Sequence, residues 1–211
     1  MKQVREIQLP ETMVAADLMT DEQFFGYAPD DRKAELINGV LIMPSPAADP
    51  HEDLNGFLLS VIRTFVEERD LGVVRGAKTP VHLGVGHNYE PDVLFVARSR
   101  AGIVEHDGVF GAPDLVIEVL SPGTEHLDRG IKRQTYAQAG VRELWLLSSE
   151  SARKSAFYQR QPRAGLAAMK PQEGVLRSIA VAGLWLKFEW LWAPEGKLPR
   201  VRLVLDELGV L

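Results

Sequence analysis

The chain has 211 residues, with 29 acidic against 24 basic side chains, and 45% of its residues are hydrophobic. These values fit one globular domain with a full core, and no apolar run approaches the length of a membrane span. A net charge of −5 argues against a protein that mainly coats nucleic acid, but it allows an enzyme with a local basic groove. The absence of cysteine excludes disulfides, thiolate nucleophiles and Cys-based metal sites. No secretory signal pattern is present, so a cytoplasmic location is expected.

The first part of the chain predicts a lead-in, a short helix and a hairpin. Residues 1–19 show no periodic pattern and are expected to form a loosely attached lead-in. Thr20 and Gln23 have the spacing of a capping box, which predicts a helix that ends near Tyr27. Asn38-Gly39 stands between two apolar stretches and is the strongest short-range signal for a hairpin.

A long amphipathic helix follows. Asp49-Pro50 combines a capping residue with a proline suited to the first helical position. Apolar residues then recur at spacings of three and four as far as Val66, which predicts one buried stripe. Gly72 is the expected C-terminal stop of this helix.

The remainder of the chain alternates predicted strands and helices. A second helix is expected over residues 124–139 with Gly140 as its stop, a β meander over 155–188 and a terminal helix over 201–208. The predicted strands are Val73–Arg75, Pro80–Leu83, Asp92–Ala97, Leu115–Leu120 and Glu143–Leu147. This order favours an α/β core with a mixed sheet.

A carboxylate interrupts the most apolar of these strands. Glu118 shares a strand face with Val116 and Leu120, and an ionised carboxylate buried there requires a partner or must be neutral. A metal ion is one candidate partner, and an Arg or Lys from elsewhere in the chain is the other. Asp92 opens a neighbouring predicted strand and could lie beside Glu118. Asp114 lies four residues away on the same strand, about 13 Å, so it cannot share a cation with Glu118 and is interpreted as a turn or cap residue.

Three stretches together resemble the Uma2 family, which is placed in the PD-(D/E)XK nuclease superfamily. They are ELINGVLIMPSP, EPDVLFVAR and GAPDLVIEVLSPGTEHLDRGIKRQTYAQAGVRELWLL, and the resemblance runs over about residues 20–192. It implies a restriction-endonuclease-like α/β core, a mixed β-sheet flanked by helices, with additional C-terminal β strands. Residues 193–211 would then form a C-terminal tail, in which the terminal helix is expected.

The resemblance also implies a metal-dependent endonuclease acting on DNA, with Mg²⁺ or Mn²⁺ as cofactor. Asp92 and Glu118 correspond to the family's metal-binding carboxylates, and the carbonyl of Val119 to a further ligand. The superfamily's lysine, usually two residues after the Glu, falls on Leu120 in this chain. Lys132, four residues before Tyr136 on one helix face, is the nearest substitute, with Lys78 as a weaker candidate.

Two more residues enter the predicted catalytic set through the resemblance. Glu35 corresponds to an early glutamate that completes the acidic cluster, although a polar residue on a hairpin edge would look the same. His51 lies in the first turn of the long helix, where it could bind a phosphate or a water, or simply be exposed. Lys132 could likewise be an exposed helix lysine.

Alternatives of a different class therefore stay open. One is a catalytically inactive nuclease-fold module that binds nucleic acid or protein, since Leu120 replaces the usual lysine. Another is a structural protein in which Glu118 pairs with an internal Arg or Lys. Four tryptophans, three of them at 185, 190 and 192, suggest core or dimer packing, which leaves a homodimer open. The histidines lack zinc-site spacing, and no partner in a membrane is expected.

Overall fold

The computed structural model describes residues 6–9, 12–15, 18–27, 32–44, 49–193 and 197–210, with side chains from residue 18 onward. Its centre is a six-stranded sheet in the order β14-β13-β12-β11-β8-β5. β11 and β12 are parallel and every other neighbouring pair is antiparallel, which confirms the predicted mixed sheet. The strands are β5 (Gly72–Gly76), β8 (Val93–Ala97), β11 (Leu115–Leu120), β12 (Glu143–Ser148), β13 (Ala156–Gln161) and β14 (Gly165–Met169).

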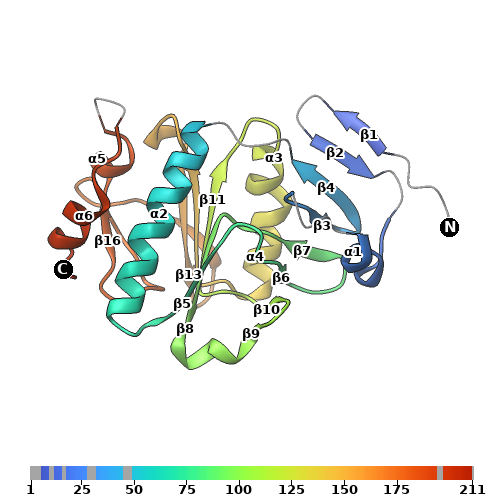
Figure 1. Cartoon of the computed structure of the whole chain (residues 1–211), viewed down its shortest axis with the longest axis horizontal. Coiled ribbons are helices and arrows are strands. Elements are labelled where there is room, and N and C mark those ends of the chain that lie inside the picture. Colours follow the sequence, from blue (N-terminus) through green and yellow to red (C-terminus); the bar gives the residue numbers. More distant parts are fainter. Residues whose placement is uncertain are drawn as a thin grey trace.

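Helices cover both faces of this sheet (Figure 1). The long helix α2 (Asp49–Glu68) packs on the face that carries Ile117 and Val119 of β11. The opposite face carries Val116 and Leu120 and packs against α4 (Arg133–Ala139). All six residues of β11 are buried, so the alternation of its side chains supplies the core on both sides.

The C-terminal elements complete the layer on the α2 side. They are the two-stranded sheet of β15 (Val175–Arg177) and β16 (Trp185–Lys187), followed by α5 (Phe188–Leu191) and α6 (Val201–Glu207). Trp185 stacks on Trp190 with 5.3 Å between ring centroids, and the Trp192 indole donates to the Ser148 carbonyl. These late tryptophans therefore pack within the described chain, as the core-packing interpretation expected.

A second sheet of eight strands lies beside the first, in the order β1-β2-β4-β3-β7-β6-β10-β9. Its hairpin β3–β4 turns at Asn38 and Gly39, whose φ angles are 51° and 76°, so the Asn-Gly prediction is confirmed. The strands are β1 (Glu6–Leu9), β2 (Thr12–Ala15), β3 (Glu35–Ile37), β4 (Val40–Pro44), β6 (Val81–His82), β7 (His87–Tyr89), β9 (Val104–Glu105) and β10 (Gly108–Phe110).

Several local predictions are confirmed and three need correction. The capping box is present at α1 (Asp21–Tyr27), where the Thr20 and Gln23 side chains accept from each other's backbone N–H groups. Gly72 is not the stop of α2, because the left-handed residue after that helix is Asp70 and Gly72 already belongs to β5. The segment predicted as a lead-in contains the hairpin β1–β2, which pairs with β4.

The third correction concerns the second predicted helix. It consists of α3 (Glu125–Leu127), a π-helical turn over Asp128–Lys132 and α4, ending at Gly140 with φ 106° as predicted. Gly130 has non-helical angles inside the turn, which explains why a continuous helix is interrupted there. Among the helices in the described ranges, none has the length and apolar content needed to cross a membrane.

Candidate active site

The predicted carboxylate pair lies where the two large sheets meet. β7 pairs with β3 in the eight-stranded sheet, and β8 pairs with β11 in the six-stranded sheet. The short connection Glu90–Asp92 therefore carries the chain from one sheet to the other. Because Val93 stands opposite Ile117 in the antiparallel ladder, the next positions along it place Asp92 opposite Glu118.

Asp92 is held firmly beside β11. Its Oδ2 accepts a hydrogen bond of 2.7 Å from the backbone N–H of Val119. Lys33 Nζ lies 3.2 Å from Asp92 Oδ1 and 4.0 Å from Glu118 Oε2. The two carboxylates thus flank one ammonium group, and their oxygens can be no farther apart than the sum of these two distances. The sequence-based placement of Asp92 beside Glu118 agrees with this geometry.

Lys132 forms the second cationic centre of the site. Its Nζ lies 2.8 Å from Glu118 Oε1, 2.9 Å from Glu35 Oε1 and 3.0 Å from Asp128 Oδ1. Its side chain is only 2% exposed, so the exposed-helix interpretation of Lys132 is wrong. Burial alone would lower the pKa of Lys132, but Asp128, Glu118 and Glu35 raise it well above its ordinary value. The group is therefore a permanent ammonium that links three carboxylates.

The π-helical turn contributes to this arrangement. Asp128, Lys132 and Tyr136 follow one another at spacings of four, and all three are buried toward the sheet. The Tyr136 hydroxyl donates to Glu118 Oε1 at 2.6 Å. Glu118 therefore has an internal lysine and a tyrosine as partners, which is the alternative to a metal that the sequence left open. Neither nearby arginine takes that role, since Arg129 pairs with Glu125 and Arg133 lies over the Tyr158 ring.

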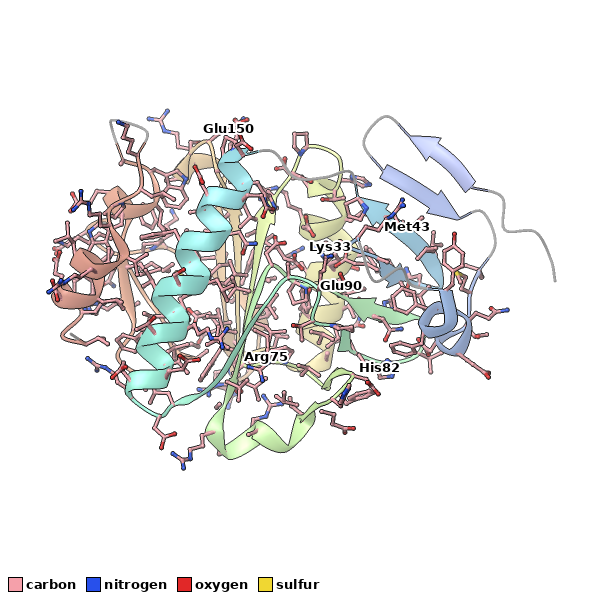
Figure 2. All side chains as sticks on the ribbon, in the orientation of Figure 1. Lys33, Met43, Arg75, His82, Glu90 and Glu150 are labelled. Atoms are coloured by element: carbon pink, nitrogen blue, oxygen red, sulfur yellow. The ribbon has the colours of Figure 1, made fainter. Side chains whose placement is uncertain are left out.

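Glu35 and Glu90 extend the cluster into the eight-stranded sheet. Glu35 is 2% exposed and lies on β3, between β4 and β7, so it is not on a sheet edge. One oxygen of Glu35 also accepts a 2.9 Å hydrogen bond from the Glu90 backbone N–H. The Glu90 side chain is buried, and its Oε2 has no hydrogen-bond partner among the described residues. Figure 2 shows Glu90 and Lys33 together near the middle of the molecule, in agreement with the charge interaction between them.

His51 joins the site from the first turn of α2. Its Nε2 lies 3.6 Å from Asp92 Oδ2, its Nδ1 lies 3.2 Å from Glu52 Oε1, and its side chain is 12% exposed. Burial lowers the pKa of His51, but its contact with Asp92 outweighs this and the net shift is upward. His51 therefore faces the carboxylate cluster and is not an exposed terminal residue.

Burial is the largest influence on the pKa of two carboxyls in the cluster. Burial raises the pKa of Glu118 to about 7, although Lys132 and Lys33 act in the opposite direction. Burial, with Glu35 nearby, also raises the pKa of Glu90 to about 7. Both shifts express mainly the cost of ionising a carboxyl away from water. Burial acts on Asp92 in the same direction, but Lys33 and His51 bring its pKa far below the ordinary value.

A divalent cation fits this charge balance. The ion pairs join four carboxylates, Glu35, Asp92, Glu118 and Asp128, to two lysines and His51. With all four ionised, four negative charges face two ammonium groups and His51. The pKa of Glu118, raised to about 7 by burial, and the pKa of Asp128, also raised by burial, reduce this negative charge near neutral pH. Within the described ranges, no group of three or more His, Asp or Glu side chains is arranged to hold a metal. Mg²⁺ does not require such a group, because it is usually bound through one or two carboxylates and several waters.

Other residues considered from the sequence lie in different surroundings. Lys78 interacts electrostatically with Glu90. Asp114 is buried away from the pair, accepts from the Ala97 N–H at 2.8 Å and pairs with Arg100 at 3.0 Å, as expected for a capping residue. Lys33 contacts Asp92 but was not among the site residues predicted from the sequence. Its spacing of two from Glu35 was the available signal.

Comparison with known proteins identifies the fold and the family. The fold is a mixed α/β fold shared with a nuclease-like structure. Residues 21–189 match the Uma2 family, described as "Putative restriction endonuclease", and the chain belongs to that family. The crystal structure of "a putative nuclease belonging to DUF820" from Anabaena variabilis superposes with a TM-score of 0.66 at 21% identity, covering 83% of this chain and 98% of that one. No curated protein matches the chain significantly.

Proposed function

We propose that the chain is a metal-dependent endonuclease that hydrolyses DNA phosphodiester bonds. The observation that supports this best is the placement of Asp92, directly before β8, beside Glu118 of β11, where one ammonium contacts both carboxylates. Membership of the Uma2 family is consistent with it. In this proposal Asp92, Glu118 and the Val119 carbonyl hold Mg²⁺ or Mn²⁺. Such a cation, when bound, stabilises charge on a phosphate and lowers the pKa of bound water.

The remaining residues of the cluster fix the two carboxylates. The Val119 N–H and His51 set the orientation of Asp92, while Tyr136 and Lys132 set that of Glu118. Glu35 holds the ammonium of Lys132 through both of its oxygens, at 2.9 and 3.2 Å. Side chains fixed in this way lose little freedom when a substrate binds, which is the condition for precise positioning of reacting groups.

The test is cleavage of a DNA panel, supercoiled, linear, single-stranded and branched, in Mg²⁺, in Mn²⁺ and in EDTA. Glu118→Gln and Asp92→Asn are expected to reduce cleavage at least about a hundredfold, because each removes a group worth several kcal/mol of transition-state stabilisation. Glu150→Gln is the matched control, since this carboxylate is exposed and pairs only with Lys154 in the described contacts. Mn²⁺ binding is measured in parallel by calorimetry.

The outcomes separate the proposal from its main alternative. Cleavage by the wild type and the Glu150 variant, lost in both site variants, supports the nuclease. Mn²⁺ binding that depends on Glu118, without cleavage of any DNA, would instead indicate an inactive nuclease-fold module. If the wild type neither binds Mn²⁺ nor cleaves any DNA, the proposal is overturned. Glu118 would then serve only as a partner of Lys132.

A further inference from the structure

The two lysines of the cluster differ in what their ammonium groups can still contact. Lys132 Nζ donates to both oxygens of Glu35 and forms ion pairs with Glu118 and Asp128, so carboxylates of three described residues surround it. Its side chain is 2% exposed. Lys33 lies within hydrogen-bond distance of Asp92 alone among the described partners, and its side chain is 24% exposed. Only Lys33 therefore combines contact with the carboxylates and access from solvent.

The position of Lys33 coincides with that of the proposed cation. Its Nζ lies 3.2 Å from Asp92 Oδ1 and 4.0 Å from Glu118 Oε2, so it contacts both side chains that would bind a metal. An ammonium group and a divalent cation cannot occupy this space together, because they exclude and repel each other. Binding of the metal therefore requires the Lys33 ammonium to move.

The local structure allows that movement without unfolding. Ala34, the next residue, is fully buried in a cluster with Phe24 and Leu36, and Glu35 begins β3. The backbone after Lys33 is therefore anchored, while its long side chain is partly accessible to solvent. A lysine released from the carboxylates at this position can therefore reach a phosphate that binds beside them.

We propose that Lys33 is the substrate-facing lysine of the site: a divalent cation displaces its ammonium from Asp92 and Glu118, and the displaced group then contacts a DNA phosphate. Lys132 is in this proposal a positioning residue that holds Glu118. The inference rests on the proposed nuclease function and assigns within it the role that the sequence placed on Lys132.

The test measures two ligands of one variant, Lys33→Met. Removing the competing ammonium is expected to raise Mn²⁺ affinity about tenfold, measured by calorimetry. Removing one phosphate contact is expected to weaken binding of a short DNA duplex in Ca²⁺ and to reduce the slope of log affinity against log salt by about one. A merely structural role would not change the two affinities in opposite directions.

Controls and outcomes are as follows. Lys170→Met, an exposed lysine after β14, should leave both affinities unchanged, and Lys33→Arg should retain the salt slope. Circular dichroism and thermal melting establish that each variant is folded. If Lys33→Met has an unchanged Mn²⁺ affinity or an unchanged salt slope, the proposed role of Lys33 is overturned. The nuclease proposal still stands in that case, provided that the wild type binds Mn²⁺ and cleaves DNA. Absence of Mn²⁺ binding by the wild type would overturn both proposals.

Discussion

Replacing Lys132 by methionine is expected to lower the free energy of unfolding by about 3–5 kcal/mol, the usual cost of removing one partner of a buried ion pair. The substitution leaves Glu35, Glu118 and Asp128 facing one another with their shared ammonium gone. Methionine fills a similar volume, so the loss arises from uncompensated charge and not from a cavity. Against a typical total of about 5–15 kcal/mol, the variant loses a large share of its stability.

Urea denaturation followed by tryptophan fluorescence measures this loss, because Trp145 is buried in the core. The double variant Lys132→Met/Glu118→Gln should be more stable than the sum of the single effects predicts, by about 0.5–3 kcal/mol, since it removes one of the unpaired charges. Lys170→Met, on the surface, should stay within about 0.5 kcal/mol of the wild type. A Lys132→Met variant within about 1 kcal/mol of the wild type would refute the reasoning.

Three further outcomes are expected. Glu143→Ala should lower the free energy of unfolding by about 3 kcal/mol or more, because this buried carboxylate accepts hydrogen bonds from Trp145, Gln159, Ser178 and two backbone N–H groups. Glu150→Ala should lower it only slightly in the same urea assay, and a similar loss in both variants would contradict the prediction. Gly72→Ala should cost about 1–3 kcal/mol, since a Cβ there collides with the Val96 carbonyl oxygen, while Gly56→Ala, with open space around it on α2, should stabilise by about 0.5–1 kcal/mol. Mn²⁺ at a hundred times its dissociation constant should stabilise the wild type by about 2.7 kcal/mol in a thermal melt. The substitution Glu118→Gln or the addition of EDTA should remove this gain. Equal melting temperatures of the wild type with and without Mn²⁺ would count against a metal site.

The elements that the sequence predicted well are those fixed by local chemistry. The capping box of α1, the Asn-Gly turn of β3–β4 and the stop at Gly140 each depend on a few adjacent residues, and each is present. The sequence predicts β6 within Pro80–Leu83, but it does not predict the short strands β7, β9 and β10. Strands of two or three residues are too short for a period of two to be recognised, and they form because neighbouring strands offer partners.

The candidate site divides in the same way. Asp92 and Glu118 could be paired from sequence because two adjacent strands impose a register on them. The contact between Lys33 and Asp92 spans 59 residues and depends on how β3 packs beside the connection from β7 to β8, for which no periodic pattern exists. The burial of Lys132 was equally hidden, since a basic stretch such as Arg129–Arg133 looks like an exposed helix face until the π-helical turn rotates Lys132 inward.

The location of the cluster explains why these charges are buried at all. Glu35 comes from one sheet, Glu118 from the other, and Asp92 from the connection that crosses between them. At this junction backbone N–H groups satisfy part of the cluster, since Glu90 N–H donates to Glu35 and Val119 N–H donates to Asp92. Lys132 and Lys33 supply the positive charge from two further segments. A buried carboxylate requires such partners, because an uncompensated buried charge costs free energy. Of the two lysines, Lys132 is almost fully buried, whereas Lys33 is partly exposed and contacts both Asp92 and Glu118. A partly exposed ammonium in contact with two carboxylates is what a site that exchanges an internal cation for an external one requires.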